Sequence, residues 1–169
     1  MNSDPPRSSP AARGRLRGER TVVNRQRQVH VRPASLRAFL ERASRLVFSA
    51  GAGVTVCLVS DREIARWNRR YRGKPGPTDV LSFPMAEARR ASNRIRLPGD
   101  SAASLERGDI AISPAAARRN ARALGRGLDR ELRVLILHGL LHLAGYDHET
   151  DRGQMERREM LLRRRLGIG

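Results

Sequence analysis

Residues Leu128–His148 read LDRELRVLILHGLLHLAGYDH. Within Val134–Ala144 every residue is apolar except two histidines and one glycine, which predicts a buried helix over roughly 128–144. This helix is too short to span a bilayer, which takes about 20 apolar residues. Gly145 follows directly and is suited to the positive φ that ends a helix. We therefore expect a central buried helix that stops at a sharp turn.

The two histidines of this helix form a candidate metal site. His138 and His142 are four residues apart, so their side chains lie on the same helical face, with about 5–6 Å between the Cβ atoms. A turn at Gly145 can bring His148 to the same place, and three histidines with an open fourth position are typical of catalytic zinc. The alternative is that these are ordinary core histidines. We predict one zinc ion bound by His138, His142 and His148.

Two neighbouring residues bear on the chemistry of this site. Asp147 is a candidate carboxylate for holding one ligand ring by the free N–H of that ring, although a simple turn-forming role fits it equally well. The zincin pattern H-E-x-x-H places a glutamate next to the first histidine as a general base, and here that position is Gly139. The sequence therefore argues against a zincin peptidase. His30 lies far away in the chain, and we assign it no role.

Outward from this helix, short apolar runs and helical spacings alternate along the chain. No internal repeats occur. This mixture predicts one modest sheet packed with helices, in an α+β or α/β fold. Strands are predicted near 22–31, 54–59, 80–83 and 109–113, and helices near 33–48, 61–67, 114–124 and 151–166.

The amino-acid composition is uneven along the chain. Residues 1–20 are rich in Pro, Ser, Gly and Arg and carry almost nothing that can pack, so we predict a disordered basic tail. Residues 21–169 form the predicted domain, interrupted by an exposed polar loop over about 86–106.

Cys57 is the only cysteine and lies in an apolar run, which is typical of a core thiol. With no membrane span or secretory signal, we expect a cytoplasmic protein.

The net charge of +17 comes almost wholly from arginine, since Lys74 is the only lysine. An excess this large favours a polyanionic partner, most often nucleic acid and less often an anionic membrane surface. The alternative is a compositional bias towards arginine that reflects no particular partner. For the basic last helix, RNA contact and a plain solvated face are equally good interpretations.

Residues 138–148 match every fixed position of the pattern H-G-x-L-H-L-x-G-Y-D-H. In this stretch the chain resembles the YbeY family of bacterial endoribonucleases. Two upstream segments are also similar to that family: Asn68–Arg72 (NRRYR), which leads into Pro77–Pro84 (PTDVLSFP), and Gly108–Ser113 (GDIAIS). Together the resemblance covers about residues 22–166, leaving out the tail; the polar loop is a second departure from the family pattern.

The resemblance implies an α+β fold with a small mixed sheet, packed with helices around a central helix that carries the metal-binding histidines. It also implies a zinc-dependent endoribonuclease, specific for single strands, that acts in ribosomal RNA maturation at the 3′ end of the small-subunit RNA and in ribosome quality control. RNA, the small ribosomal subunit and assembly factors are then the expected partners. By position, Arg72 corresponds to the family's functionally important arginine.

The residues themselves suit this chemistry, because zinc supplies activated water and Lewis acidity and an arginine can clamp a phosphate with two N–H groups. Two other functions stay open at this point. One is a zinc hydrolase of another bond type, such as a peptidase or amidase. The other is a non-catalytic ribosome assembly factor with a structural metal. Imidazole also suits nickel and copper.

Overall fold

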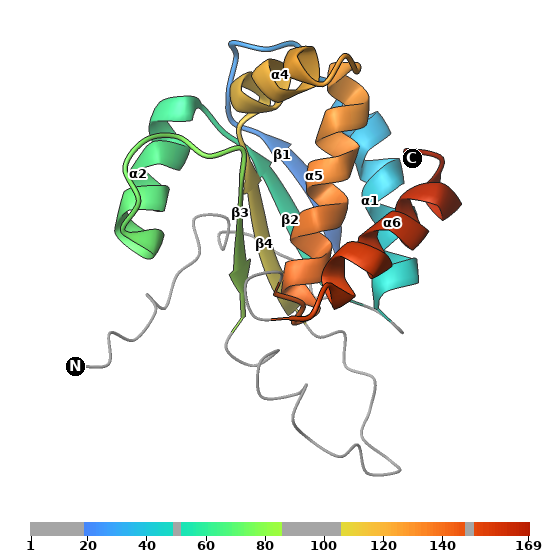
Figure 1. Ribbon diagram of the computed structural model, residues 1–169. Helices are drawn as coiled ribbons and strands as arrows, with labels where there is room; N and C mark the ends of the chain where they lie inside the picture. The colour runs from blue at the N-terminus through green and yellow to red at the C-terminus, as the bar shows by residue number, and fades with distance from the viewer. Residues whose placement is uncertain (1–18, 49–51, 86–105, 148–150) are drawn as a thin grey trace, which may run out of the picture.

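The structure is a computed structural model that describes residues 19–48, 52–85, 106–147 and 151–169. In these residues, four strands and five helices form a mixed α+β arrangement (Figure 1). The first 18 residues and nearly all of the predicted polar loop lie outside the described residues. The elements are β1 (Arg20–Asn24), α1 (Pro33–Val47), β2 (Gly53–Leu58), α2 (Asp61–Arg72), β3 (Val80–Pro84), β4 (Glu106–Ile112), α4 (Pro114–Ala123), α5 (Leu128–Leu143) and α6 (Gln154–Leu166).

The strands form one mixed sheet in the order β1-β2-β4-β3. β2 pairs in parallel with β1 and with β4, whereas β3 runs antiparallel to β4 along one edge. The register places Ser82 of β3 opposite Ile110 of β4. Since successive side chains of a strand point to opposite faces, Ser82 and Ile110 share one face, and Phe83 belongs to the other. The small mixed sheet that the family resemblance implies is confirmed.

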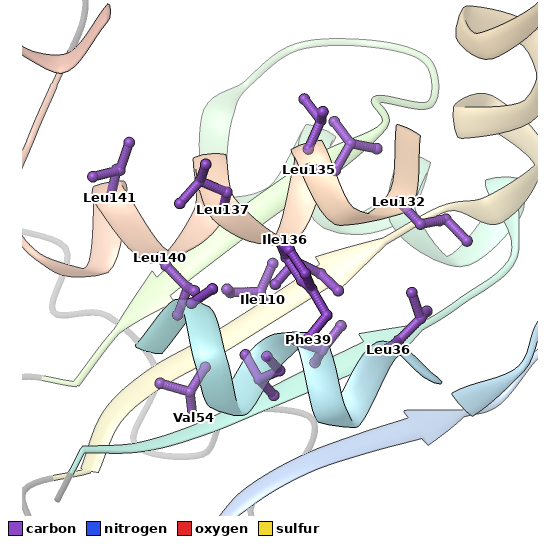
Figure 2. Packing of buried hydrophobic residues seen from close by; sticks show 14 of the residues in the cluster. Leu36, Phe39, Val54, Ile110, Leu132, Leu135, Ile136, Leu137, Leu140 and Leu141 are labelled. Atoms are coloured by element: carbon purple, nitrogen blue, oxygen red, sulfur yellow. The ribbon is translucent and has the colours of Figure 1, made fainter. Parts of the chain in front are cut away.

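Helices α1 and α5 cover one face of the sheet, and α5 lies at the centre of this layer (Figure 1). Its apolar side chains meet those of α1 and of the two central strands in a single core (Figure 2). Complete burial of a Leu or Ile side chain contributes about 1.5–3 kcal/mol, so this core determines where α5 lies. None of the helices in the described part of the chain has the length and apolar character to cross a membrane. Fully buried members of the core include Leu36, Leu40, Val54, Val56, Ile110, Ile112, Ile136, Leu137, Leu140 and Leu141.

Helix α2 packs on the opposite face of the sheet, where Cys57 is buried as predicted. The Ser60 side chain caps the helix by accepting a hydrogen bond from the Glu63 N–H at 3.2 Å. The helix continues past its predicted end at residue 67 as far as Arg72. One reason is that Tyr71, in the last turn, packs edge-on against Phe83 of β3 with 5.2 Å between ring centroids. Tertiary contact therefore extends this helix beyond its local pattern.

The first strand is shorter than predicted. β1 ends at Asn24, and the segment containing Val29 is not a strand although Val29 itself is buried. The Gln26 side chain accepts from the Val29 N–H at 2.9 Å and donates to the Val29 carbonyl at 2.9 Å. The Gln26 side-chain amide thus forms the hydrogen bonds that the N–H and carbonyl of Val29 would make to a neighbouring strand in a sheet.

Candidate metal centre

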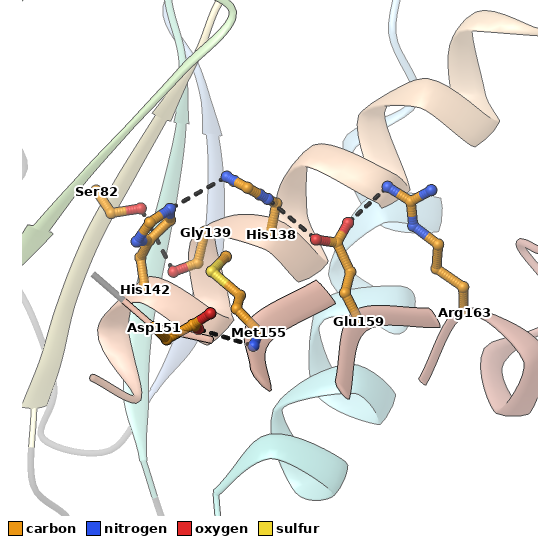
Figure 3. A network of polar contacts seen from close by, with 8 residues as sticks. All are labelled: Ser82, His138, Gly139, His142, Asp151, Met155, Glu159 and Arg163. Carbon is orange, nitrogen blue, oxygen red and sulfur yellow. Dashed lines mark hydrogen bonds and ion pairs between the residues drawn. The ribbon is translucent and has the colours of Figure 1, made fainter. Parts of the chain in front are cut away.

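His138 and His142 lie one helical turn apart on α5, on the part of its surface that leaves the core. Their Nε2 atoms are 3.1 Å apart and their ring centroids 4.7 Å apart, so the two imidazoles point towards one another (Figure 3). The prediction that both rings point to one place is confirmed. The His138 side chain is 28% exposed, which leaves this point open to solvent.

The separation of the two nitrogens suits a shared metal ion. Two ligands of a tetrahedral zinc with Zn–N bonds of about 2.0–2.1 Å stand about 3.3 Å apart, close to the separation found here. Two imidazole lone pairs that face each other repel unless a proton or a cation lies between them. In the described residues no three His, Cys, Asp or Glu side chains form a metal-holding group. The third predicted ligand, His148, lies outside the described residues.

Glu159 of α6 contacts this pair and is a residue that sequence reasoning missed. Its Oε2 lies 3.2 Å from His138 Nδ1, and its Oε1 lies 2.5 Å from Arg163 Nη2 (Figure 3). Its side chain is only 12% exposed. A signal existed in the sequence, because Glu159 falls within the helical stripe that Met155, Leu162 and Leu166 bury. A carboxylate within such a buried stripe calls for a partner.

The environment of Glu159 keeps its carboxyl group ionised. Burial raises the pKa of Glu159, but the hydrogen bond with His138 and the positive charge of Arg163 more than offset burial, so this pKa lies below its ordinary value. At neutral pH the group is therefore a carboxylate, which only accepts hydrogen bonds. The hydrogen bond at His138 is then donated by the Nδ1–H of the ring.

Gly139, between the two histidines, lies against Ile110 of β4 with no room for a side chain. A Cβ atom built on it would lie 2.7 Å from Cγ2 and 2.9 Å from Cδ1 of Ile110. The Ser82 hydroxyl donates to the Gly139 carbonyl at 3.4 Å. The glutamate that a zincin carries at this position has no room here, so tight packing explains the glycine and excludes a general base at this place.

Replacing Gly139 with alanine is expected to lower the free energy of unfolding. Overpacking against Ile110 costs about 1–3 kcal/mol, which outweighs the gain in helix propensity of at most about 1 kcal/mol. Denaturant unfolding measures the change. The matched variant Ile110→Ala removes the atoms that the new methyl group would meet, so the double variant should lose less than the sum of the single losses. Strictly additive losses would show that Ile110 does not constrain position 139.

Helix α5 ends at Leu143 with Ala144 as its C-cap, and Gly145 makes the turn that was predicted to follow the helix. Gly145 has φ 93°, its N–H donates to the His142 carbonyl at 3.0 Å, and the Tyr146 N–H donates to the Leu141 carbonyl at 3.1 Å. This Schellman pattern turns the chain directly after the end of the helix that carries both histidines. Asp147 follows and lines an open hollow of about 630 Å³ beside the turn. Its role in holding a ligand ring stays a prediction.

Arg72 is the last residue of α2, with an exposed side chain. Helix α2 packs on the face of the sheet opposite α5, and edge strand β3 lies between the two helices in Figure 1. Arg72 thus comes from a separate element, not from the helix that carries the histidines. Its role towards a substrate stays a prediction.

The fold and the converging histidine pair place the chain among small α+β proteins with a candidate metal site on a buried helix. A family model described as "Endoribonuclease YbeY" matches residues 21–167, and the chain belongs to this family. The chain is 42% identical over 147 residues to "Endoribonuclease YbeY" of Koribacter versatilis, covering 87% of this chain and 86% of that protein. It is 36% identical to the protein of the same name in Solibacter usitatus, covering 88% of each.

A solved structure is similar over most of the chain. The solution structure of TM1509 from Thermotoga maritima matches with a TM-score of 0.56 and 27% sequence identity. The match covers 88% of this chain and 89% of that one. The similarity therefore extends over nearly the whole domain and is not confined to the histidine helix.

Proposed function

We propose that this member of the endoribonuclease YbeY family is a zinc-dependent enzyme that cleaves single-stranded RNA. Membership of this family, which takes part in rRNA processing, makes the chain an endoribonuclease, a hydrolase acting on RNA. The observation that carries the metal requirement is the pair of Nε2 atoms 3.1 Å apart on α5. The proposed substrate is ribosomal RNA, chiefly the 3′ end of the small-subunit RNA, with a further role in ribosome quality control.

In this proposal, His138 and His142 hold one zinc ion per chain, and His148 is the third ligand on the strength of the sequence pattern. When bound, zinc supplies Lewis acidity towards the phosphoryl oxygens and activates water for attack. The two rings are half-buried, so an ion that they held would lie within reach of an RNA strand. Asp147 is proposed, from the sequence, to steady one of the ligand rings.

Arg72 is proposed to clamp the scissile phosphate. A guanidinium donates two parallel N–H bonds to a phosphate and keeps its charge at any physiological pH. Other arginines would bind the RNA backbone without reading its sequence. The described surface supplies them on α2 and α6, where exposed members are Arg62, Arg66, Arg69, Arg70, Arg157, Arg164 and Arg165.

The arginines of α6 divide into two groups. Neither RNA contact nor a plain solvated face therefore describes all of them. Arg163 binds Glu159, and Arg158 donates to the Leu46 carbonyl at 3.2 Å, so both serve the fold. Arg164 and Arg165 are exposed and can meet phosphates. We expect the RNA-binding share of this helix to come from the exposed members.

The expected partners follow from this substrate: the small ribosomal subunit and its assembly factors, met in the cytoplasm where ribosomes mature. We also propose that the domain spans residues 21–169 and that residues 1–20 are a basic tail adding nonspecific RNA affinity. β1 begins at Arg20, which pairs with Val54, so the sheet starts one residue before the proposed boundary. The composition of the tail offers too little apolar surface to contribute to the core.

Cleavage of a short single-stranded RNA from the 3′ region of small-subunit rRNA tests the proposed function. Zinc-loaded protein should cut this RNA, should leave the same sequence intact in a duplex, and should lose activity after chelation. Adding back zinc, nickel or copper separately identifies the metal that restores cleavage. Activity that survives complete removal of metal would overturn the metal requirement. Cleavage of a peptide or amide with no cleavage of RNA would favour a hydrolase of another bond type. The absence of activity in every assay would favour a non-catalytic assembly factor.

A further inference from the structure

We propose that Glu159 positions His138 for metal binding and that Arg163 holds Glu159 in place. This role rests on the proposed metal site. The three side chains form a chain of contacts: Arg163 Nη2 to Glu159 Oε1 at 2.5 Å, Glu159 Oε2 to His138 Nδ1 at 3.2 Å, and His138 Nε2 facing His142 Nε2 at 3.1 Å (Figure 3). A carboxylate behind a ligating histidine is a recurrent way of orienting such a ring.

Glu159 selects the form of His138 that can bind a metal. A neutral imidazole carries its proton on one nitrogen and a lone pair on the other. Because the Glu159 carboxylate accepts a hydrogen bond from Nδ1, it keeps the proton there and leaves the lone pair on Nε2. Nε2 is the nitrogen that faces His142. Without the carboxylate, both tautomers become populated, and one of them presents N–H to the metal.

Arg163 fixes the direction in which this carboxylate points. It lies four residues after Glu159 on α6 and occupies one carboxylate oxygen, which leaves the other aimed at His138. The alternative is an ordinary surface pair, but such pairs lie in solvent, and the Glu159 side chain is 12% exposed. The helix itself is anchored to the core by Met155, Leu162 and Leu166. Glu159 and His138 thus both belong to helices that pack into the core.

Glu159→Gln tests this role with little change in size. Glutamine can accept a hydrogen bond from Nδ1–H through its oxygen or donate one to an Nδ1 lone pair through its amide group, so it no longer selects a tautomer. In the full-length protein, competition with a chelator should show zinc binding weakened by about 10- to 100-fold. Nitrogen-15 NMR of the metal-free protein should show His138 shifting from a single Nε2-unprotonated tautomer to a mixture.

The matched control is Glu156→Gln, which removes the same charge from an exposed position of the same helix. It should leave both zinc affinity and the His138 tautomer unchanged. If Glu159→Gln does not fold, Arg163→Met keeps Glu159 and should show the same two changes to a smaller extent. Wild-type zinc affinity and an unchanged tautomer in the folded Glu159→Gln or Arg163→Met protein would overturn the proposal.

The tautomer measurement separates this role from the proposed function. It uses metal-free protein and no RNA, so it reports on the state of the His138 ring independently of metal binding and of cleavage. If wild-type protein binds no zinc, the proposed metal site fails whatever the tautomer result. If wild-type protein binds zinc and cleaves RNA while Glu159→Gln changes neither zinc affinity nor tautomer, only the role of Glu159 fails.

Discussion

His142→Ala is expected to remove the bound zinc and the cleavage of RNA together. The variant deletes one of two nitrogens that lie 3.1 Å apart, so the remaining ligands hold the ion too weakly to retain it through purification. Metal catalysis supplies several kcal/mol, and each 1.36 kcal/mol corresponds to a factor of ten, so turnover should fall about 10³-fold or more. His138→Ala and His148→Ala should have the same effect.

Elemental analysis, turnover and melting temperature measured on one preparation decide this prediction. The structure offers a matched control in His30→Ala, because His30 is exposed and belongs to no part of the candidate site. That variant should keep one zinc per chain and full activity. The histidine site would be refuted by a His142→Ala protein that keeps both its zinc and its turnover.

Arg72→Ala is expected to lose most of its catalysis while it keeps zinc and fold. Removing one donor to the charge that develops in a transition state costs about 10²- to 10³-fold in turnover. RNA affinity should change much less, because many other exposed arginines share the contacts to the backbone. Arg72→Lys should recover only part of the loss, since lysine restores the charge but not the planar pair of donors.

The competing interpretation makes Arg72 a structural residue at the end of α2. In that case Arg72→Ala should melt at a lower temperature, and its activity should fall only in proportion to its folded fraction. Arg69→Ala is the matched control, because Arg69 is exposed on the same last turn of the helix. A stable, zinc-loaded and fully active Arg72→Ala protein would remove Arg72 from the mechanism.

The local features of this protein could be read from its sequence. The apolar run of α5 predicts a buried helix, and the spacing of His138 and His142 predicts rings that meet, because a helix repeats every 3.6 residues wherever it lies. Gly145 predicts the turn that follows, since a positive φ is a property of a single residue. The α+β class follows from the alternation of strand and helix patterns along the chain.

Contacts between elements far apart in the sequence could be identified only from the tertiary structure. Glu159 meets His138 across 21 residues and between two helices, and only the packing of α6 on α5 determines which carboxylate arrives there. Gly139 is needed because Ile110 of β4 comes close, and the backbone N–H and carbonyl groups of Val29 bond to the Gln26 side chain and not to a strand. Local patterns reflect the geometry of one element, whereas these contacts depend on how several elements share one core, which no short stretch of sequence encodes.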